Sequence, residues 1–348
     1  EAAQKAINDN FSHYTPVPGL PEVRSAIATK FKRDNGLEFK VDQIVISTGA
    51  KQSLANVCLC LLNAGDEVLL PCPYWVSYAE IIKLAEGIPV EVPSNISTDF
   101  KVTPEELEAA ITPKTKMLIF SSPCNPSGTV YTQSELEDIS KMLERHPDIY
   151  VVSDEIYEHI NFTDKHFSIG TIPLMTNRTI TVNGVSKGFA MTGWRVGFIG
   201  APTWIAKACN KIQGQVTSAT CAIAQKAAER AMLAEPKSTT KDMKETFLRR
   251  RNMLIGLLKD IPGVRCNVPQ GAFYVFPEIS SYFGKSEGNT TINNANDLCM
   301  YLLNNAHVAC VAGDAFGSPE CMRISYAASD AKLTEAMHRI KIFLAKLS

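Results

Sequence analysis

The sequence predicts an α/β protein with two domains. The large domain is built on a mostly parallel, seven-stranded sheet covered by helices on both faces, and the smaller one is an α+β domain. Three observations support this class. Short apolar runs alternate with segments of helical periodicity through the first two-thirds of the chain, as in a wound α/β sheet. The pattern changes after the turn at Pro262 and Gly263. The length of 348 residues also exceeds the usual size of one domain.

The strands predicted for the large domain are short, apolar runs, several of them rich in β-branched residues. In chain order they span residues 44–46, 68–70, 90–92, 117–120, 150–152, 179–182 and 196–199. Because helical segments connect most of them, the strands should be mostly parallel, and ligands should bind at their carboxyl ends.

Helical segments lie between these strands, for example at residues 52–62, 104–111 and 133–143. Two of them begin with a capping box, in which Thr103 is followed by Glu106 and Thr132 by Glu135. The chain opens at Glu1, without a methionine, in a helical pattern over residues 2–7. We therefore expect that an N-terminal arm is missing.

A charged helix at residues 241–258 leads into the smaller domain. We place the domains at residues 1–255 and 256–348. Strand signals at 273–276, 308–311 and 322–325, with helices at 295–304 and 332–347, indicate an α+β domain. The polar stretch 286–294 is predicted to be a surface loop.

Composition excludes several classes of function. The formal net charge of −1 gives no electrostatic reason to expect nucleic acid or an anionic membrane as a partner. The ten cysteines show no CxxC spacing, and many lie in apolar runs, so we expect reduced thiols, no metal site and a cytoplasmic protein. No apolar run has membrane-spanning length, and we expect no signal peptide.

The stretch from Ser186 to Gly197 places Lys187 among small residues, with Arg195 eight positions later. A lysine amine that is desolvated or near other cations loses its proton readily and attacks a carbonyl, and an arginine can bind a phosphate bidentately. This pair suits a cofactor that carries an aldehyde and a phosphate. The alternative is two solvated surface charges. The apolar run 179–182 just before the stretch favours a lysine at a strand end, facing a cleft.

Further motifs follow one another over nearly the whole chain. They are Tyr14-Thr15-Pro16, Gly49-Ala50-Lys51-Gln52, Pro73-Tyr74-Trp75, Asn125-Pro126-Ser127-Gly128, Asp154-Glu155-Ile156-Tyr157, the lysine stretch, Gly271-Ala272-Phe273-Tyr274 and Arg323-Ile324-Ser325. In these motifs the chain resembles the pyridoxal-phosphate-dependent aminotransferases of fold type I, in particular the bacterial-type aspartate aminotransferases. The resemblance implies pyridoxal 5'-phosphate as cofactor, Lys187 as its anchor and as the catalytic base, and a homodimer with shared active sites.

The resemblance also assigns residues to the cofactor ring. A carboxylate buried at a strand end needs a cationic partner, and Asp154 would bind the protonated ring nitrogen; the alternative is a helix-capping aspartate. Tyr157 and Asn125 would donate to the ring oxygen, although Asn-Pro followed by Ser-Gly is also an ordinary turn sequence. Trp75 would stack on the ring, and its alternative is a core position.

The phosphate would be bound by Arg195, the Ser186 hydroxyl and the backbone of Gly49, Ala50 and Lys51, where free N–H groups at a helix start favour an anion. By the same resemblance, Tyr14 would reach the phosphate of the neighbouring subunit; a local surface loop is the alternative. We expect Gly128, Gly197 and Gly271 to serve tight backbone geometry.

Substrate binding is assigned to Lys51, Trp75, Asn125 and Arg323. Arg323 lies between apolar residues and suits a substrate carboxylate as its planar partner; a structural salt bridge is the alternative. Lys51 would reach the distal carboxylate of a dicarboxylic substrate, or it is a solvated lysine on the first turn of a helix.

The resemblance therefore implies a ping-pong transamination between L-aspartate, or a similar acidic amino acid, and 2-oxoglutarate. An aminotransferase for prephenate, aromatic or other amino acids, a pyridoxal-phosphate lyase on the same fold, and a sensor domain similar to an aminotransferase are the alternatives.

Overall fold

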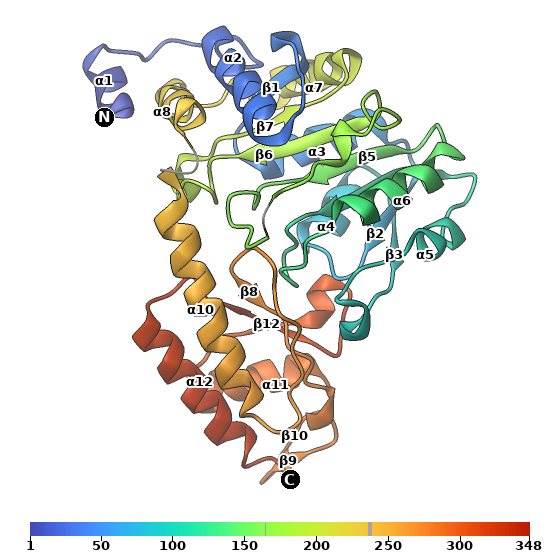
Figure 1. The fold of residues 1–348 in the computed structure, drawn as a ribbon, viewed down its shortest axis with the longest axis vertical. Coiled ribbons are helices and arrows are strands. Elements are labelled where there is room, and N and C mark those ends of the chain that lie inside the picture. Colours follow the sequence, from blue (N-terminus) through green and yellow to red (C-terminus); the bar gives the residue numbers. More distant parts are fainter. Residues whose placement is uncertain (164, 236–238) are drawn as a thin grey trace.

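A computed structural model describes residues 1–163, 165–235 and 239–348. Its centre is a seven-stranded sheet in the order β1-β7-β6-β5-β4-β2-β3 (Figure 1). The strands are β1 (Ile44–Ser47), β2 (Glu67–Pro71), β3 (Ile88–Val92), β4 (Thr115–Ser121), β5 (Tyr150–Asp154), β6 (Thr179–Gly184) and β7 (Gly197–Gly200). β7 pairs antiparallel with both β1 and β6, and the other pairs of this sheet are parallel. All seven predicted strands and the mostly parallel sheet are confirmed.

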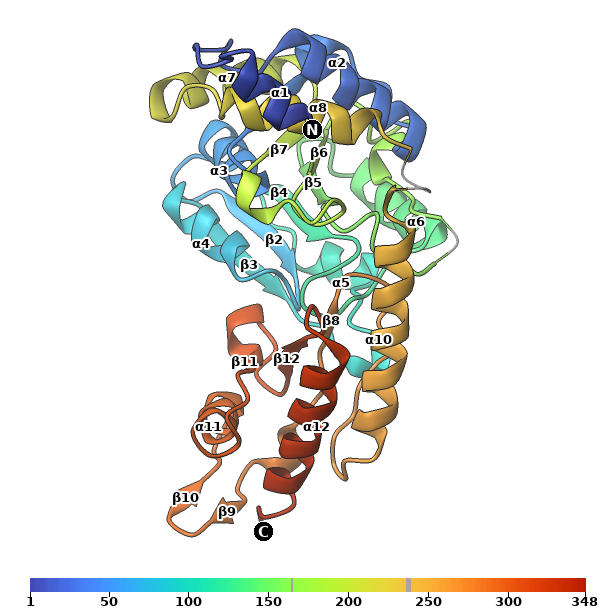
Figure 2. The same ribbon diagram turned by 90° about the vertical axis from the view of Figure 1, so that its left-hand side faces the viewer.

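Helices cover both faces of this sheet. On one face α3 (Ala50–Leu61), α4 (Ser77–Leu84) and α7 (Thr203–Val216) form one core with alternate strand residues such as Val68 and Leu70. On the other face Leu69 packs in the core of α5 (Pro104–Ala109) and α6 (Gln133–Glu144). Nearby, α2 (Pro21–Lys30) and α8 (Ala222–Leu233) cover β1 and β7. Figure 2 shows the strands between α3 and α4 on one side and α6 on the other.

The predicted helix starts are confirmed in detail. Both capping boxes form, since the Thr103 and Thr132 hydroxyls accept from the backbone N–H groups of Glu106 and Glu135, and each glutamate accepts from its threonine's N–H in return. The opening helix α1 spans Ala2–Asn8 and packs against α8. A π-helical turn at Phe31–Asn35 extends α2.

The C-terminal part begins with the long helix α10 (Lys241–Lys259), which lies beside α12 (Asp330–Leu344) (Figure 1). These helices, α11 (Ala295–Tyr301) and the sheet β11-β12-β8 surround one core. Leu254 and Ile255 belong to that core, so the boundary that we propose at residue 255 falls inside α10.

Two of the three strands predicted for this part are shorter in the structure. β8 is only Tyr274–Val275, because Ala272 adopts a left-handed φ of +57° just before it. β11 is only Val311–Ala312 instead of 308–311, because the chain leaves a π-helical turn through His307 at φ +54°. β12 spans Met322–Ser325 as expected. The loop predicted at 286–294 instead contains a hairpin of β9 (Ser286–Glu287) and β10 (Thr290–Thr291).

All ten cysteines are free thiols, and six of them are buried. In the described parts of the chain, no helix has the length and apolar character needed to span a membrane.

Candidate active site

The carboxyl ends of the parallel strands open into a pocket of about 300 Å³. The strand register aligns Ser121 of β4 with Asp154 of β5, and Asp154 with Val182 of β6, so the segments that follow these strands meet at one edge of the sheet. The pocket is lined by Ala50, Lys51, Trp75, Tyr78, Ser121, Asn125, Asp154, Ile156, Tyr157, Ser186, Lys187, Thr192, Arg195, Tyr274 and Arg323. It therefore brings together all the predicted site residues except Gly49, which precedes Ala50, and Tyr14.

Lys187 follows β6 and is partly buried. Its ammonium nitrogen lies 5.8 Å from the Tyr157 ring centroid and 5.5 Å from that of Phe273. Burial, together with the positive charges of Arg195 and Arg323, lowers the pKa of Lys187, and the Asp154 carboxylate opposes this. The side chain thus has the lowered pKa that a nucleophilic amine requires.

Asp154 ends β5 and is 3% exposed. Its Oδ2 accepts a hydrogen bond from the Tyr78 hydroxyl at 2.7 Å, and its Oδ1 accepts from the Ile156 N–H at 3.2 Å. Both donors are neutral, and burial raises the pKa of Asp154 to about 6. The carboxyl is therefore a site for a cation or a proton.

At one part of the pocket, the N-terminus of α3 lies close to the Arg195 guanidinium. Gly49 has φ +86° and caps the N-terminus of α3. A Cβ atom on Gly49 would lie 2.2 Å from the Arg195 Nη2, and one on Gly197 would lie 2.1 Å from the Ala50 nitrogen. Only glycine fits at either position, and this close approach puts a fixed positive charge beside the helix N-terminus, which suits an anion.

Gly128 and Gly271 also serve close packing, as predicted. A Cβ on Gly128 would lie 2.4 Å from the Pro269 Cβ, and one on Gly271 would lie 2.6 Å from the Pro123 Cβ.

Arg323 reaches the pocket from β12. Its Nη1 donates to the Asn125 Oδ1 at 2.9 Å, and its guanidinium carbon lies 4.7 Å from the Tyr274 ring centroid and 4.9 Å from that of Phe316. Its buried Nε has no hydrogen-bond partner. Among the described residues no carboxylate forms an ion pair with Arg323, so the structural salt bridge considered above is not present. The guanidinium is held in place with donors free for an anion.

Lys51 and Trp75 lie together at the pocket. The Lys51 Nζ lies 4.9 Å from the Trp75 ring centroid, and Trp75 makes an edge contact with Tyr78. Lys51 is exposed and Trp75 is half-buried, which places a cation near one face of an aromatic side chain that lines the pocket.

Tyr14 lies outside the pocket and is 98% exposed. The segment after it is fixed to the large domain, because Thr15 accepts from the Gln225 side chain at 3.0 Å and the Val17 carbonyl accepts from the Gln213 side chain at 2.9 Å. The backbone is therefore held while the tyrosine projects away from its own chain.

Sequence reasoning did not assign five of the lining residues: Tyr78, Ser121, Ile156, Thr192 and Tyr274. Ile156, Thr192 and Tyr274 lie within the motifs described above, but the motifs do not by themselves indicate a role for them. Ser121 and Ile156 adjoin assigned strand ends, which was the available signal. Tyr78 carried no local signal, because its contact with Asp154 spans 76 residues.

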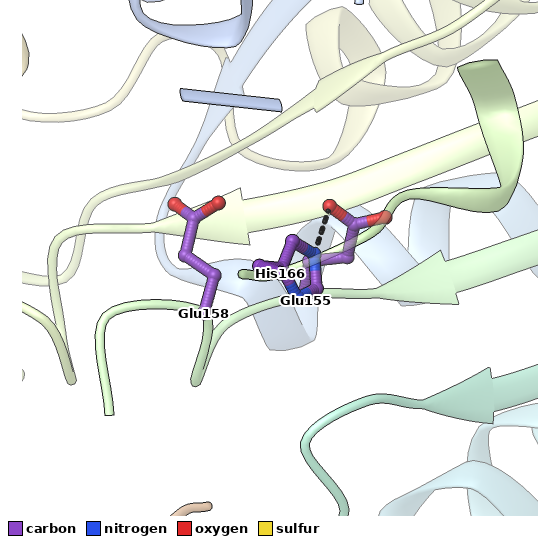
Figure 3. A group of neighbouring side chains, drawn as sticks. All are labelled: Glu155, Glu158 and His166. Atoms are coloured by element: carbon purple, nitrogen blue, oxygen red, sulfur yellow. Dashed lines mark hydrogen bonds and ion pairs between the residues drawn. The ribbon is translucent and has the colours of Figure 1, made fainter. Parts of the chain in front are cut away.

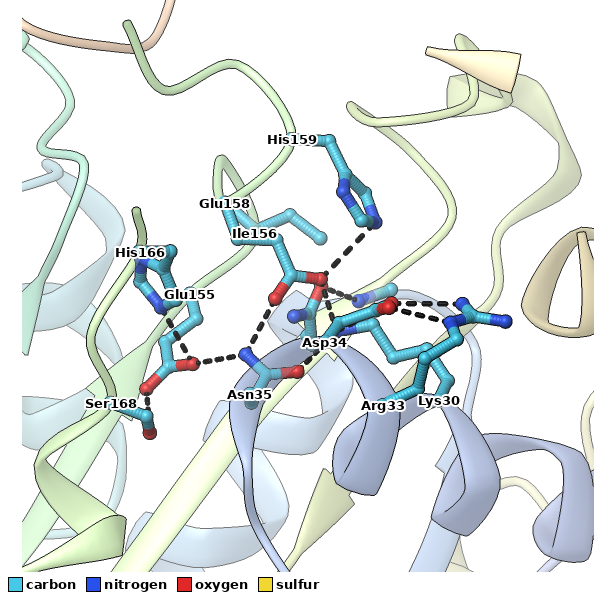
Figure 4. A network of polar contacts seen from close by, with 12 residues as sticks. Lys30, Arg33, Asp34, Asn35, Glu155, Ile156, Glu158, His159, His166 and Ser168 are labelled. Atoms are coloured by element: carbon cyan, nitrogen blue, oxygen red, sulfur yellow. Dashed lines mark hydrogen bonds and ion pairs between the residues drawn. The ribbon is translucent and has the colours of Figure 1, made fainter. Parts of the chain in front are cut away.

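A buried ionic network surrounds Glu155 and Glu158, which follow β5 (Figure 4). The Asn35 amide donates to the Glu155 Oε2 at 2.9 Å and to the Glu158 Oε2 at 2.6 Å, and the Lys30 ammonium pairs with Glu158. Burial would raise the pKa of Glu158, but Lys30 and the neighbouring histidines outweigh it and lower the pKa to about 2. Asp154, Ile156 and Tyr157 thus line the pocket, while Glu155 and Glu158 belong to the network.

Part of this network resembles a metal-binding group. Ligand atoms of Glu155, Glu158 and His166 lie within 4.8 Å of one another (Figure 3). The His166 Nε2 already contacts the Glu155 Oε2 at 2.9 Å, and the Asn35 amide donates to both glutamates. Since Lys30 also supplies a positive charge, the group holds its own counter-charges and we do not assign a metal to it.

Comparison with known proteins agrees with this geometry. The family model for aminotransferase class I and II matches residues 1–340. The chain belongs to this family. It is 48% identical to the bifunctional aspartate aminotransferase and glutamate/aspartate-prephenate aminotransferase of Petunia hybrida, over 98% of this chain and 72% of the relative.

Two further relatives extend the likeness. The aspartate/prephenate aminotransferase of Cereibacter sphaeroides is 46% identical over 100% of this chain and 87% of its own. The crystal structure of the aspartate aminotransferase from Rhizobium meliloti superimposes with a TM-score of 0.96 at 42% identity, covering 100% of this chain and 87% of that one. The predicted family and the aminotransferase fold are thereby confirmed.

Proposed function

We propose that this aminotransferase uses pyridoxal 5'-phosphate to move an amino group between L-aspartate, or a similar acidic amino acid, and 2-oxoglutarate by a ping-pong mechanism. The observation that carries the proposal is the Lys187 amine, whose pKa is lowered by burial and by Arg195, in a pocket that also contains the Asp154 carboxyl and Arg323. The names of the relatives support the substrate class.

The chemistry of the pocket fits this cofactor at each of its polar ends. The buried Asp154 carboxyl, bonded only to neutral donors in the described chain, fits a protonated ring nitrogen. The helix N-terminus at Gly49 and the adjacent Arg195 guanidinium fit a phosphate. The groups that would hold the cofactor are Lys187 at the aldehyde carbon, Asp154 at the ring nitrogen, Tyr157 and Asn125 at the ring oxygen, Trp75 at the ring face, and Arg195, Ser186 and the backbone of Gly49, Ala50 and Lys51 at the phosphate.

When bound, pyridoxal 5'-phosphate supplies an electron sink for a carbon that loses a proton. The residues of the chain move the proton and bind the substrate. As general base, the Lys187 amine would take the proton from the substrate α-carbon, and as general acid it would deliver that proton to the cofactor carbon that carried the aldehyde; its lowered pKa favours the neutral form that the first step requires. Asn125 and the flanking rings orient Arg323, so that it can bind the substrate α-carboxylate through two hydrogen bonds.

Lys51 supports the preference for a dicarboxylic substrate. It is exposed at the pocket beside Trp75, where its ammonium can bind a distal carboxylate. Replacing it by alanine should lower kcat/KM for aspartate by roughly 10- to 100-fold, as expected when one partner of a charge-assisted bond is lost, with little change for alanine as donor. Lys83→Ala, an exposed lysine of α4 outside the pocket, is the matched control.

A coupled assay with L-aspartate and 2-oxoglutarate tests the proposal directly. The proposal would be overturned if none of a panel of acidic, aromatic and neutral amino acids served as an amino donor. Prephenate as a better acceptor than 2-oxoglutarate, or a preference for aromatic donors, would select one of the related aminotransferases. Consumption of an amino acid without an oxo acid acceptor would indicate a lyase, and binding without turnover a sensor. If Lys51→Ala lowered kcat/KM equally for aspartate and for alanine, Lys51 would have a role only at the phosphate.

We further propose a homodimer in which Tyr14 completes the partner's phosphate site. The support is its 98% exposure on a backbone segment held by Gln213 and Gln225. The ten free thiols support a cytoplasmic location.

A further inference from the structure

Tyr274 contacts one residue that we propose to bind the substrate and one that we propose to bind the cofactor. It lies on β8 of the C-terminal part, and its hydroxyl is 2.9 Å from the hydroxyl of Tyr157, which follows β5 of the large domain. The face of the same ring lies 4.7 Å from the Arg323 guanidinium carbon. Tyr274 and Tyr157 are 6% and 3% exposed. One side chain therefore joins the arginine of the substrate site to the tyrosine of the cofactor site.

Counting protons sets the direction of the hydrogen bond between the two tyrosines. Each hydroxyl carries one proton, and in the described chain neither has another hydrogen-bond partner. If Tyr157 donates its proton to the cofactor's ring oxygen, it can only accept from Tyr274. Tyr274 then donates to Tyr157, and both buried hydroxyls are satisfied at once.

This direction strengthens Tyr157 as a donor. A hydroxyl that accepts a hydrogen bond becomes a better donor, because successive hydrogen bonds polarise one another in a buried site. The Arg323 cation over the Tyr274 ring draws electron density from it and makes the Tyr274 hydroxyl a better donor in turn. The chain Arg323, Tyr274, Tyr157 thus stabilises negative charge on the ring oxygen.

We propose that Tyr274 is a positioning residue, which acts on the cofactor's ring oxygen through Tyr157 and holds Arg323 with the face of its ring. The inference rests on the proposed function, since it takes the cofactor and its contact with Tyr157 from there. Its two parts are separable, because phenylalanine keeps the ring and removes only the hydroxyl.

The test is a pH titration of the visible absorption of the cofactor-loaded protein. The group that titrates is the imine that Lys187 would form with the cofactor. Hydrogen bonds that stabilise negative charge on the ring oxygen favour the deprotonated imine and so lower the midpoint. Tyr274→Phe should therefore raise the midpoint by about 0.5 pH unit, a change smaller than that from losing one full hydrogen bond. KM for the amino acid should change less than about twofold, because the ring under Arg323 remains. Tyr274→Leu should shift the midpoint similarly and also raise KM.

Tyr326→Phe is the matched control. It removes another buried hydroxyl of the C-terminal core, which donates to the Ala272 carbonyl at 3.2 Å, and it should leave the midpoint unchanged. In a Tyr157→Phe background, adding Tyr274→Phe should produce no further shift. A full additional shift there, or a Tyr274→Phe midpoint equal to that of the control, would overturn the inference.

A second measurement keeps the shape of the side chain. Replacing Tyr274 with 3-fluorotyrosine makes its hydroxyl a stronger donor and should lower the midpoint, the opposite direction from phenylalanine; a rise or no change would count against the inference. If the wild-type protein shows no cofactor absorption or no transamination, the proposed function fails. A normal wild type with an unshifted Tyr274→Phe defeats the inference alone.

Discussion

Replacing Asp154 by asparagine should make the cofactor-free protein more stable at neutral pH, although it removes a central residue of the proposed site. The carboxyl is 3% exposed, and burial raises its pKa from 3.8 to about 6. A rise of this size corresponds to about 3 kcal/mol of unfavourable free energy when the group is ionised in the folded protein.

Asparagine removes this unfavourable term and keeps the shape of the side chain. Its amide oxygen can still accept from the Ile156 N–H, while its Nδ2 faces the Tyr78 hydroxyl, which must then accept a hydrogen bond instead of donating one. Losing the bond to a charged acceptor should cost about 1 kcal/mol. The net gain in the free energy of unfolding should be about 2 kcal/mol at pH 7.5.

The pH dependence has a defined sign. The folded pKa is raised, so the folded state binds more protons than the unfolded state between pH 3.8 and about 6. The stability of the wild type therefore falls as the pH rises through this window. The advantage of Asp154→Asn should be largest above pH 6 and should disappear near pH 4.

Urea unfolding of cofactor-free wild type and Asp154→Asn at matched protein concentration, from pH 4 to 7.5, measures this difference. Asp148→Asn, an exposed aspartate just before β5, is the control and should track the wild type. Excess pyridoxal 5'-phosphate should reverse the order, because the wild type binds it more tightly and gains more by mass action. A cofactor-free variant that is no more stable than wild type at pH 7.5 would refute the reasoning.

Three further predictions concern the anchor, the dimer and the network. Borohydride should fix the cofactor irreversibly to Lys187, and an adduct mapped to another lysine would exclude that anchor. Mixing Tyr14→Phe with Lys187→Ala subunits should give hybrids with one intact site and partial recovery of activity; activity equal to the average of the separate proteins would argue against shared sites. Glu158→Gln should lower the free energy of unfolding by about 3 kcal/mol at pH 7, because buried Lys30 loses its nearer carboxylate and keeps only Asp34, at 3.8 Å. Since the pKa of Glu158 is lowered from 4.5 to about 2, the effect should fade as the pH falls through that range in urea unfolding curves; Glu38→Gln in an exposed ion pair is the control.

The sequence by itself determined the local elements and the identity of most pocket residues. Apolar runs and capping boxes depend on neighbouring residues, so β1 to β7 and the starts of α5 and α6 could be predicted from short windows. The residues of the motifs follow strand ends, and in a parallel sheet those ends meet at one edge. Asp154 and Lys187 could therefore be placed in a common cleft before the order of the strands was known.

Only the tertiary structure decided how these residues are paired. The contacts of Arg323 with Asn125, of Tyr274 with Tyr157 and of Asn35 with Glu155 join positions 198, 117 and 120 residues apart. They depend on the order of the strands and on how the C-terminal part packs against the sheet, and neither leaves a local periodicity in the chain. The same holds for the pKa of Asp154, because burial sets it and burial comes from elements distant in sequence.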